Sequence, residues 1–476
     1  MKPRIVIIGG GPGGYAAAMR GARLGADVTL IERDTVGGVC LNRGCIPTKT
    51  MIHAVQVLKQ ARKAPELGVA IDGPVRIDLQ RLMARKEAVV QGQVSGMLGF
   101  LQQNGVRFLT GHASLEGERI VVQQADGQIT TVDWDKLVLA TGAEPRDLPA
   151  LPFDGKRVLS TSDALEIDET PESLLIVGGG VIGCEFAFLF QGMGSRVVVV
   201  EALPRALPLP WVDEECAKVI SLEMKKLKIA LHANRTVEGF EKRGEKLRVT
   251  IGSPIQTAGV REKDKGPLVE EVAKVLVCVG RKPACGGMGL DERGIQRDGE
   301  GWIVVNDRME TSAPGIYAIG DVLGPSRIML AHVASAEGVV AVENALGSDR
   351  VMDYGAVPSA VFTMPELSGV GLTELQAKQR ADCEVQCHRA LFRNVGKSHI
   401  LDDITGMAKI VSDAKTGKIL GVHMVGPHAA ELIAEGALAV KLGCTVKDLA
   451  QLAHAHPTLA EVVTEVLASG AIHDRW

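Results

Sequence analysis

Residues 5–14 read IVIIGGGPGG, and residues 174–183 read LLIVGGGVIG. In both stretches a short apolar run, typical of a buried parallel strand, leads directly into Gly-x-Gly-x-x-Gly. A helical stretch, a second apolar run and a glutamate follow in each case, and every glycine and the glutamate recur 169 residues later. A single GxGxxG has little specificity, but two complete strand–turn–helix–strand–acid units predict two dinucleotide-binding domains.

The glycines and the acid of such a unit have separate tasks. The first glycine makes the turn, the second lets a pyrophosphate approach the backbone, and the third lets the helix pack on the strand. The helix N-terminus attracts the phosphates, and the carboxylate accepts hydrogen bonds from a ribose. Tight packing without a ligand is the competing interpretation, which the complete pattern disfavours. The candidate residues are Gly9, Gly11, Gly14 and Glu32 in the first copy and Gly178, Gly180, Gly183 and Glu201 in the second.

The composition excludes several classes of protein. At 476 residues the chain is long enough for about three domains of ~150 residues each. Its 46% hydrophobic and 23% charged residues are typical of a globular protein that works in water. A net charge of -4 gives no sign of a nucleic-acid partner. Because no run of ~18 apolar residues occurs, we expect no membrane-spanning helix and a cytoplasmic location.

Periodic apolar residues predict a helix over 78–103 between the two fingerprints. The second nucleotide unit is expected to close near residues 275–281, and a strand is expected to deliver Asp321 at its end. From about residue 350 a new alternation of strands and helices predicts a C-terminal domain. The candidate buried positions of the helix are Leu79, Leu82, Met83, Val89, Val90, Met97 and Leu98.

Cys40 and Cys45 follow the first fingerprint, with four residues between them. A disulfide closing so short a loop adds little stability through loop entropy, and a strained bridge is easily reduced. The pair is therefore predicted to be a redox catalyst. We expect Cys45 to begin a helix, whose N-terminus would stabilise its thiolate and face the cofactor. Cys40, in the preceding loop, would exchange with substrate, and Lys49 would either reach the cofactor or remain solvated.

Residues 454–461 read HAHPTLAE and contain a candidate acid–base pair. Thiol–disulfide exchange needs a group that removes and returns a proton, and histidine titrates in the appropriate range. If a helix begins after Pro457, Glu461 would fold back onto His456 and orient it. A simple turn or helix start is the alternative interpretation. The cluster of Cys383, Cys387 and His388 has no second ligand pair, so no metal site is predicted.

These motifs resemble the pyridine nucleotide-disulfide oxidoreductase family, and the resemblance extends over essentially the whole chain. The fold it implies is α/β, with two Rossmann-like dinucleotide-binding domains and a C-terminal α+β dimerisation domain. The implied ranges are 1–147 for the first part of the FAD domain, 148–279 for the NAD domain, 280–349 for a central domain and 350–476 for the interface domain. The matching segments are Gly9 to Glu32, GGVCLNRGCIPTK at 37–49, ATG at 140–142, the second fingerprint, GRKP at 280–283, YAIGD at 317–321, LAH at 330–332 and HAHPTLAE.

The resemblance also implies cofactor contacts. It places FAD on the first fingerprint and NAD on the second, and it pairs Lys49 with Glu185. Independently of the resemblance, Glu201 favours NAD, because a carboxylate at that position would repel a 2′-phosphate. The implied FAD contacts are Glu32, Lys49, Ala113, Gly142, Asp321 and Ala331, and the implied NAD site includes Val237 and Gly280.

The activity implied by the resemblance is oxidation of protein-bound dihydrolipoamide to lipoamide with reduction of NAD⁺. In the family the active site is shared across a homodimer, so that His456 and Glu461 would serve the Cys40–Cys45 pair of the other subunit. The implied partners are lipoyl domains of 2-oxoacid dehydrogenase complexes or the lipoyl carrier of glycine cleavage.

Three departures from the family pattern leave the choice of partner open: Arg43 lies between the cysteines, and Thr48 and Ala460 replace commoner serines. An NAD(P)H-dependent reductase of another disulfide, similar to glutathione reductase, is the main alternative. Mercuric reductase is disfavoured because residues 472–476 contain no cysteine pair. A flavin-binding scaffold or sensor without turnover would not need both the cysteine pair and the histidine–glutamate pair.

Overall fold

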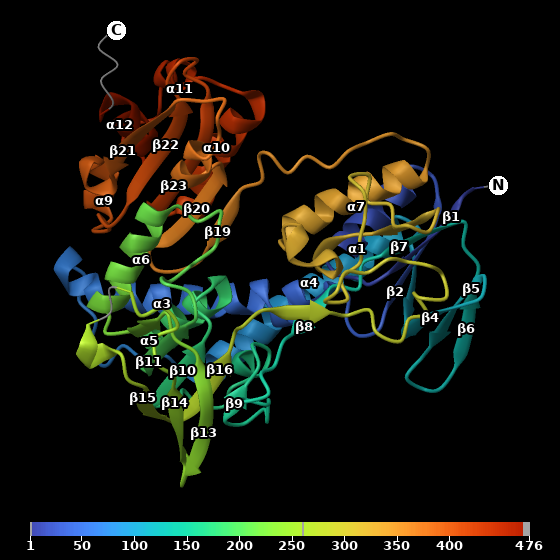
Figure 1. Cartoon of the computed structure of the whole chain (residues 1–476), viewed down its shortest axis with the longest axis horizontal. Coiled ribbons are helices and arrows are strands. Elements are labelled where there is room, and N and C mark those ends of the chain that lie inside the picture. The colour runs from blue at the N-terminus through green and yellow to red at the C-terminus, as the bar shows by residue number, and fades with distance from the viewer. Residues whose placement is uncertain (1, 259–260, 470–476) are drawn as a thin grey trace. The chain divides into compact units, whose positions relative to one another are not determined.

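The computed structural model describes residues 2–258 and 261–469, and Figure 1 labels its helices and strands where there is room. The chain forms two compact units, each assembled from segments that are distant in sequence. Residues 472–476, on which the argument against mercuric reductase depends, lie outside the described residues. Unit 1 comprises Met1–Arg146, Thr161–Asp168 and Val279–Met352, and unit 2 comprises Asp147–Ser160, Glu169–Cys278 and Asp353–Trp476.

A parallel five-stranded sheet forms the centre of unit 1, with the strand order β18-β7-β1-β2-β3. Ile5, Val6, Ile7 and Ile8 of its central strand are all buried, without the alternation of a half-exposed strand. Continuous burial is expected where both faces of a parallel sheet are covered. The strands are β1 (Arg4–Ile8), β2 (Asp27–Glu32), β3 (Arg107–Thr110), β7 (Lys136–Leu139) and β18 (Ile316–Ala318).

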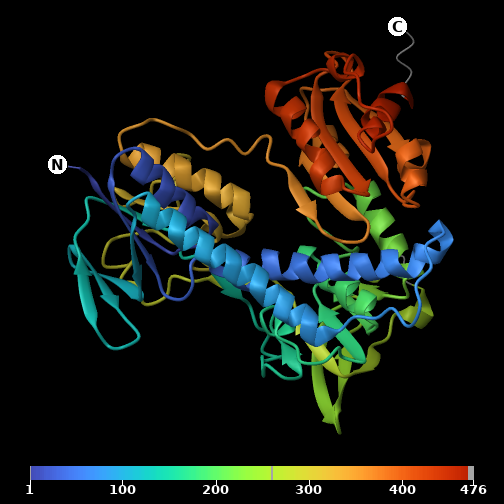
Figure 2. The same ribbon diagram turned by 180° about the vertical axis from the view of Figure 1, so that it is seen from behind.

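Helices α1 (Pro12–Arg23) and α7 (Ala331–Ala345) pack against each other in unit 1. The two long helices α3 (Cys45–Lys63) and α4 (Leu79–Gln103) follow one another along the chain and also pack together, as Figure 2 shows. The smaller strands of unit 1 form a three-stranded antiparallel sheet and a two-stranded pair. These strands are β4 (His112–Glu116), β5 (Arg119–Gln123), β6 (Ile129–Val132), β8 (Ala143–Pro145) and β17 (Arg281–Pro283).

The helix predicted over 78–103 is confirmed as α4, and Asp78 caps it by accepting a hydrogen bond from the Arg81 backbone N–H at 3.1 Å. The predicted buried face was only partly right. Leu82 and Val90 are buried, as predicted, but Leu98 is 37% exposed. Lys86, Val94 and Leu101, which were not among the predicted positions, are also buried. The apolar pattern alone did not determine which side of this glycine-containing helix faces the protein.

Unit 2 contains a second parallel five-stranded sheet, with the strand order β12-β11-β10-β16-β9. Its strand β10 (Ser173–Val177) is buried at all five positions, as β1 is over most of its length. A three-stranded antiparallel sheet of order β13-β14-β15 lies in the same unit. The other elements are β9 (Val158–Leu159), β11 (Arg196–Glu201), β12 (Ala230–Ala233), β13 (Val237–Arg243), β14 (Lys246–Ile251), β15 (Leu268–Val272), β16 (Lys274–Val277), α5 (Val181–Met193) and α6 (Glu214–Lys226).

The C-terminal part of unit 2 is an antiparallel five-stranded sheet of order β19-β20-β23-β22-β21, packed with helices. This alternation of strands and helices confirms the change of pattern predicted from about residue 350. The elements are β19 (Ser359–Val361), β20 (Glu366–Gly371), α8 (Glu374–Lys378), β21 (Val385–Leu391), α9 (Gly396–Ile400), β22 (Met407–Asp413), β23 (Ile419–Gly426), α10 (Ala429–Leu442), α11 (Val446–Ala450) and α12 (Glu461–Ser469).

A buried ion cluster joins the C-terminal sheet to α6 within unit 2. Lys409 of β22 places its ammonium 3.0 Å from Asp213, which caps α6, 3.3 Å from Glu215 and 2.6 Å from Glu374. Arg389 pairs with Glu215 and Glu374 in turn. Because Lys409 is fully buried, removing one partner would leave an uncompensated charge, which is costly. The cluster therefore fixes how the C-terminal sheet lies against α6.

The helices within residues 2–258 and 261–469 were also compared with the requirements of a membrane span. None of them is both long enough and apolar enough to cross a bilayer.

Candidate active site

The first and third glycines of the first fingerprint are fixed by backbone contacts. Gly9 has φ +108°, and a Cβ there would lie 2.2 Å from the Ala140 carbonyl oxygen. A Cβ on Gly14 would lie 1.8 Å from the Gly9 carbonyl oxygen. Gly11 differs, because its φ of -69° suits any residue and the nearest atom to a Cβ would be 4.0 Å away. The backbone does not require a glycine at 11, but an approaching pyrophosphate does.

Glu32 ends β2 with its carboxylate held by two backbone groups. The Gly10 N–H donates to Oε2 at 2.7 Å, and the Asp34 N–H donates to Oε1 at 2.9 Å. The side chain is buried at the carboxyl end of the parallel sheet. A carboxylate fixed at this edge is positioned to accept hydrogen bonds from ribose hydroxyls.

Two polar groups of unit 1, the Thr141 hydroxyl and the Asp321 carboxyl, fit a bound cofactor. The Thr141 hydroxyl is buried and has no hydrogen-bond partner among the described residues. Leaving such a group unpaired costs about 1–3 kcal/mol, so a ligand atom there would be favourable. Burial raises the pKa of the Asp321 carboxyl, and Arg281, with its Nε 3.7 Å away, opposes this. Together with the open space at Gly11, these groups fit FAD.

The other predicted FAD contacts also belong to unit 1. Ala113 lies in β4 and is buried, and Ala331 is the first residue of α7. Gly142 follows β7 with φ +72°, a conformation that favours glycine. Their contacts with a cofactor stay predictions.

The two candidate redox cysteines lie on successive helices. The prediction that Cys45 begins a helix is confirmed, because it is the first residue of α3. The prediction that Cys40 lies in a loop is wrong: it belongs to the short helix α2 (Gly38–Arg43). The hydrogen bond that the Cys40 thiol makes with Cys45, together with burial, raises the pKa of Cys40, and the charge of Lys49 opposes this. The sulfur atoms are thus adjacent, as a reversible disulfide requires.

Local hydrogen bonds explain why α2 forms so soon after Glu32. Gly37 precedes it with φ +97°, and its N–H donates to the Gly10 carbonyl at 2.8 Å. The Asn42 amide donates to the carbonyls of Val36 and Gly38 at 3.1 and 2.9 Å. These bonds keep the cysteine-bearing helix against the first fingerprint.

Arg43, the residue that departs from the family pattern, forms an ion pair with Asp34 near the end of β2. Both side chains are about half exposed, at 49% and 47%. From the sequence, this cation left the choice of partner open. Its partner in the structure is a carboxylate outside the cysteine pair.

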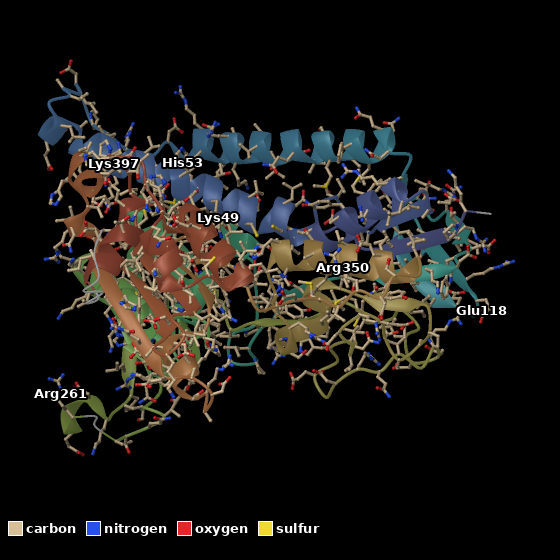
Figure 3. All side chains as sticks on the ribbon, turned by 90° about the horizontal axis from the view of Figure 1, so that it is seen from above. Lys49, His53, Glu118, Arg261, Arg350 and Lys397 are labelled. Atoms are coloured by element: carbon tan, nitrogen blue, oxygen red, sulfur yellow. The ribbon has the colours of Figure 1, made fainter. Side chains whose placement is uncertain are left out.

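Lys49 and His53 follow Cys45 at four-residue steps along α3, and both are labelled in Figure 3. Residues at this spacing lie on one face of a helix, so Lys49 shares a face with Cys45. Glu185, its predicted partner, is buried in unit 2 and accepts a hydrogen bond from the Phe362 N–H at 3.0 Å. Because Lys49 and Glu185 belong to different units, their pairing stays a prediction.

The second fingerprint repeats the first in unit 2. Gly178 has φ +104°, and its Cβ would lie 2.4 Å from the Cys278 carbonyl oxygen. A Cβ on Gly183 would lie 1.9 Å from the Gly178 carbonyl oxygen. Gly180 has φ -74° and no atom within 4 Å of its would-be Cβ. The second glycine is again the one that leaves space for a ligand, which fits NAD.

Glu201 holds the same place as Glu32. Its Oε2 accepts from the Gly179 N–H at 2.6 Å, and its Oε1 accepts from the Leu203 N–H at 2.7 Å. The nearby cation Arg205 donates instead to the carbonyls of Leu207 and Val212, at 2.5 and 3.1 Å. A carboxylate, with the guanidinium turned to the backbone, favours a ribose hydroxyl over a 2′-phosphate. Of the other predicted NAD contacts, Val237 begins β13 in unit 2 and Gly280 belongs to unit 1.

The predicted contact between His456 and Glu461 is present. Glu461 begins α12, and its Oε1 lies 2.8 Å from His456 Nδ1. Its Oε2 accepts from the Thr458 N–H at 2.9 Å. The hydrogen bond from His456 lowers the pKa of Glu461, so this carboxylate is ionised and only accepts. Nδ1 therefore carries the proton, and Nε2 of this side chain, which is 78% exposed, is the basic nitrogen.

A second histidine in the same loop has partners that the sequence analysis did not identify. His454 Nε2 lies 3.1 and 3.2 Å from the two carboxylate oxygens of Glu435, and its Nδ1 lies 2.9 Å from the Thr464 hydroxyl. Only 7% of the His454 side chain is exposed. Glu435 is 19 residues before the histidine and lies on α10, whereas the histidine lies in a loop, so no local spacing rule connects them.

Comparison with known proteins gives a consistent result. Residues 3–338 match the model of the pyridine nucleotide-disulphide oxidoreductase family, and residues 357–467 match the dimerisation domain of that family, which supports a homodimer. The chain is 40% identical to a dihydrolipoyl dehydrogenase of Thermus scotoductus, over 98% of this chain and 97% of the relative. It is 36% identical to the dihydrolipoyl dehydrogenase of Bacillus subtilis, over 98% of each. A crystal structure of LpdA from Mycobacterium tuberculosis superimposes with a TM-score of 0.89 at 30% identity, covering 98% of this chain and 99% of that one.

Proposed function

The chain belongs to the pyridine nucleotide-disulphide oxidoreductase family, and on that basis we propose that it oxidises protein-bound dihydrolipoamide to lipoamide and reduces NAD⁺. One observation carries this proposal. Cys40 of α2 and Cys45, the first residue of α3, lie adjacent and hydrogen-bonded beside a dinucleotide fingerprint. This arrangement suits a disulfide that opens and closes with two electrons.

The chemistry balances as a dithiol–disulfide exchange. His456 Nε2 takes the proton of one substrate thiol, and the resulting thiolate attacks Cys40 in the Cys40–Cys45 disulfide. The Cys40–Cys45 bond breaks and a mixed disulfide forms. The second substrate thiol then attacks the substrate sulfur of the mixed disulfide, and the bond from that sulfur to Cys40 breaks. Nε2 passes its first proton to the departing Cys40 sulfur and takes up the proton of the second thiol. Lipoamide leaves, with Cys40 as a thiol and Cys45 as a thiolate. Glu461 keeps Nδ1 of His456 protonated throughout, which leaves Nε2 available for each transfer.

FAD, when bound, supplies the electron transfer from the cysteine pair to NAD⁺. The residues that would hold it in unit 1 are those of the first fingerprint, with Glu32 for the ribose and Thr141 and Asp321 as further polar groups. Cys45 at the start of α3 is proposed to face it, and Lys49 on the same helix face is proposed to add a positive charge there. NAD is proposed to bind at Gly180 and Glu201.

The finer assignments are part of the same proposal. The active site is proposed to be shared by two subunits, with His456 of each serving the cysteine pair of the other. We propose the four ranges 1–147, 148–279, 280–349 and 350–476 as the functional domains. Lipoyl domains of a 2-oxoacid dehydrogenase complex, or the glycine-cleavage lipoyl carrier, are proposed as partners, and the cytoplasm as the location.

A steady-state comparison on purified flavin-loaded protein tests the function. Turnover of dihydrolipoamide with NAD⁺ is measured beside turnover of glutathione disulfide with NADPH. We expect the first pair to be faster by at least about 10²-fold, because Glu201 disfavours the 2′-phosphate of NADPH. A faster reaction with glutathione disulfide and NADPH would favour a glutathione-reductase-like enzyme instead.

A further inference from the structure

The two histidines of the loop at 454–460 use opposite ring nitrogens for their carboxylates. His456 holds Glu461 through Nδ1, so Nε2 remains for proton transfer. His454 holds Glu435 through Nε2, and its Nδ1 is occupied by the Thr464 hydroxyl. Since both nitrogens of His454 have partners and its side chain is buried, it has no ring nitrogen available for a substrate proton. It therefore has a different task from its neighbour.

The positions of its partners indicate that task. Glu435 belongs to α10 and Thr464 to α12. Residues 451–460 contain no helix or strand, although they carry His456. Leu459 anchors the end of this loop in the core beside α10 and α12. His454 anchors its beginning with a hydrogen bond to a carboxylate, which is stronger than one between neutral groups.

We propose that His454 is a positioning residue for the His456–Glu461 pair, acting by tying the start of their loop to α10 and α12. This inference rests on the proposed function, because it takes His456 to be the group that moves substrate protons. A base that is misplaced by about 1 Å loses up to ~10²-fold in rate. His454 therefore affects the rate of turnover by fixing the position of the His456 imidazole.

The test compares two reactions of the flavin-loaded dimer. Dihydrolipoamide oxidation with NAD⁺ uses His456, whereas reduction of ferricyanide by NADH bypasses the histidine loop. We expect His454→Ala to lower kcat for dihydrolipoamide by about 10- to 100-fold and to leave ferricyanide reduction within about twofold. In a His456→Gln background the same substitution should cost less than about twofold, because there is no base left to position. His399→Gln is the matched control, since His399 lies outside this loop and its Nε2 donates to the Arg393 carbonyl at 2.7 Å.

Thr464 provides a milder pair of variants in case His454→Ala does not fold. Thr464→Val removes the partner of Nδ1 but leaves Glu435 in place, and Thr464→Ser restores the hydroxyl. We expect the valine variant to lose dihydrolipoamide turnover and the serine variant to regain most of it.

Wild-type dihydrolipoamide turnover in His454→Ala, with turnover in His456→Gln lowered by about 10²-fold, would overturn the positioning role. So would an equal loss of ferricyanide reduction, or losses that multiply in the double variant. Failure of the proposed function looks different: the unmodified protein would not oxidise dihydrolipoamide, or His456→Gln would keep full turnover.

Discussion

The two glycine fingerprints hold their acids in nearly the same way, although they belong to different units. Gly10 and Gly179 donate to the carboxylates of Glu32 and Glu201 at 2.7 and 2.6 Å. In each unit, the segment after the acid then donates a backbone hydrogen bond to the carbonyl of the glycine whose N–H binds that acid. In unit 1 the Gly37 N–H donates to the Gly10 carbonyl, and in unit 2 the Leu207 N–H donates to the Gly179 carbonyl, both at 2.8 Å.

The units differ in the segment that comes after this hydrogen bond. In unit 1, Gly37 leads directly into α2 and the cysteine pair. In unit 2, Leu207 leads through residues 208–213 to α6, which packs against the C-terminal sheet. The nucleotide scaffold is thus common to both units, and the cysteine pair lies in one short segment after the first acid.

The largest expected effect comes from removing one of the two candidate redox thiols, Cys40 or Cys45. Cys45→Ser, or Cys40→Ser, should lower dihydrolipoamide turnover by at least about 10³-fold, because serine cannot form a disulfide. Bound flavin and its reduction by NADH should persist, since neither fingerprint is changed. Flavin absorbance at equilibrium and stopped-flow reduction by NADH measure both.

Cys383→Ser is the matched control for these variants. Its sulfur lies 3.5 Å from the Ala377 carbonyl in unit 2, and we expect normal turnover. Turnover in Cys40→Ser close to that of the control would remove this thiol from the mechanism.

The next largest effect comes from substituting the second glycine of each fingerprint, which should weaken binding of a different nucleotide in each unit. Gly11 and Gly180 have φ of -69° and -74°, so alanine fits both backbones, and its methyl group would enter the space reserved for a ligand. Gly11→Ala should weaken retention of FAD, and Gly180→Ala should raise KM for NAD⁺ by about tenfold, equivalent to ~1.4 kcal/mol, with FAD retained. Flavin content and NAD⁺ kinetics are measured on both proteins.

Gly14→Ala and Gly183→Ala serve as the contrasting pair. Their methyl groups would lie 1.8 and 1.9 Å from backbone oxygens of the same fingerprint, so we expect loss of folded protein in both. If Gly11→Ala and Gly180→Ala also fail to fold, the second glycine is needed for packing and the ligand argument is wrong.

The repeated fingerprint, the helix at Cys45 and the contact of His456 with Glu461 were predictable because each depends on residues close in sequence. A glycine turn, a helix start and an acid five residues from its histidine are local patterns. The short helix at Cys40 was missed because its stability comes from Asn42 and from a bond back to Gly10.

Long-range partners were beyond prediction from the sequence. Lys409 pairs with Asp213, which is 196 residues away in sequence, and His454 pairs with Glu435, which is 19 residues away. Such pairs exist only once the sheets and helices have packed, and no spacing rule anticipates them. The buried face of α4 could not be predicted either: Val94 is buried and Leu98 is exposed.

A smaller effect tests the acid of the second fingerprint. Glu201→Ala should reduce the preference for NAD⁺ over NADP⁺ by about tenfold, because the charge that repels a 2′-phosphate is gone. NAD⁺ binding should weaken as well, since the ribose and the N–H groups of Gly179 and Leu203 lose their acceptor. The ratio of kcat/KM for the two coenzymes is the measurement.

Glu32→Ala is the counterpart in unit 1. We expect it to lower FAD retention and to leave the coenzyme ratio unchanged. A change in the coenzyme ratio with Glu32→Ala would contradict the assignment of separate nucleotides to the two units.

The smallest effect concerns Arg43, the cation that lies between the two cysteines. Its ion pair with Asp34 is half exposed, and exposed pairs contribute about 0–1 kcal/mol. Asn42 holds α2 independently through the carbonyls of Val36 and Gly38. Arg43→Val should therefore change dihydrolipoamide turnover by less than about twofold at ~0.5 M salt, where exposed charges are screened.

At about 0.05 M salt, two roles of Arg43 can be distinguished by comparing the effect of Arg43→Val on kcat/KM for a free lipoyl substrate and for a lipoyl domain. If Arg43 acts only through Asp34, both substrates respond to Arg43→Val in the same way, and Asp34→Asn reproduces the result. If it instead recognises acidic groups of a carrier, only the lipoyl domain loses kcat/KM, and that loss disappears as salt rises. The second outcome would show that the segment containing Cys40, Arg43 and Cys45 selects the carrier protein as well as carrying the thiols.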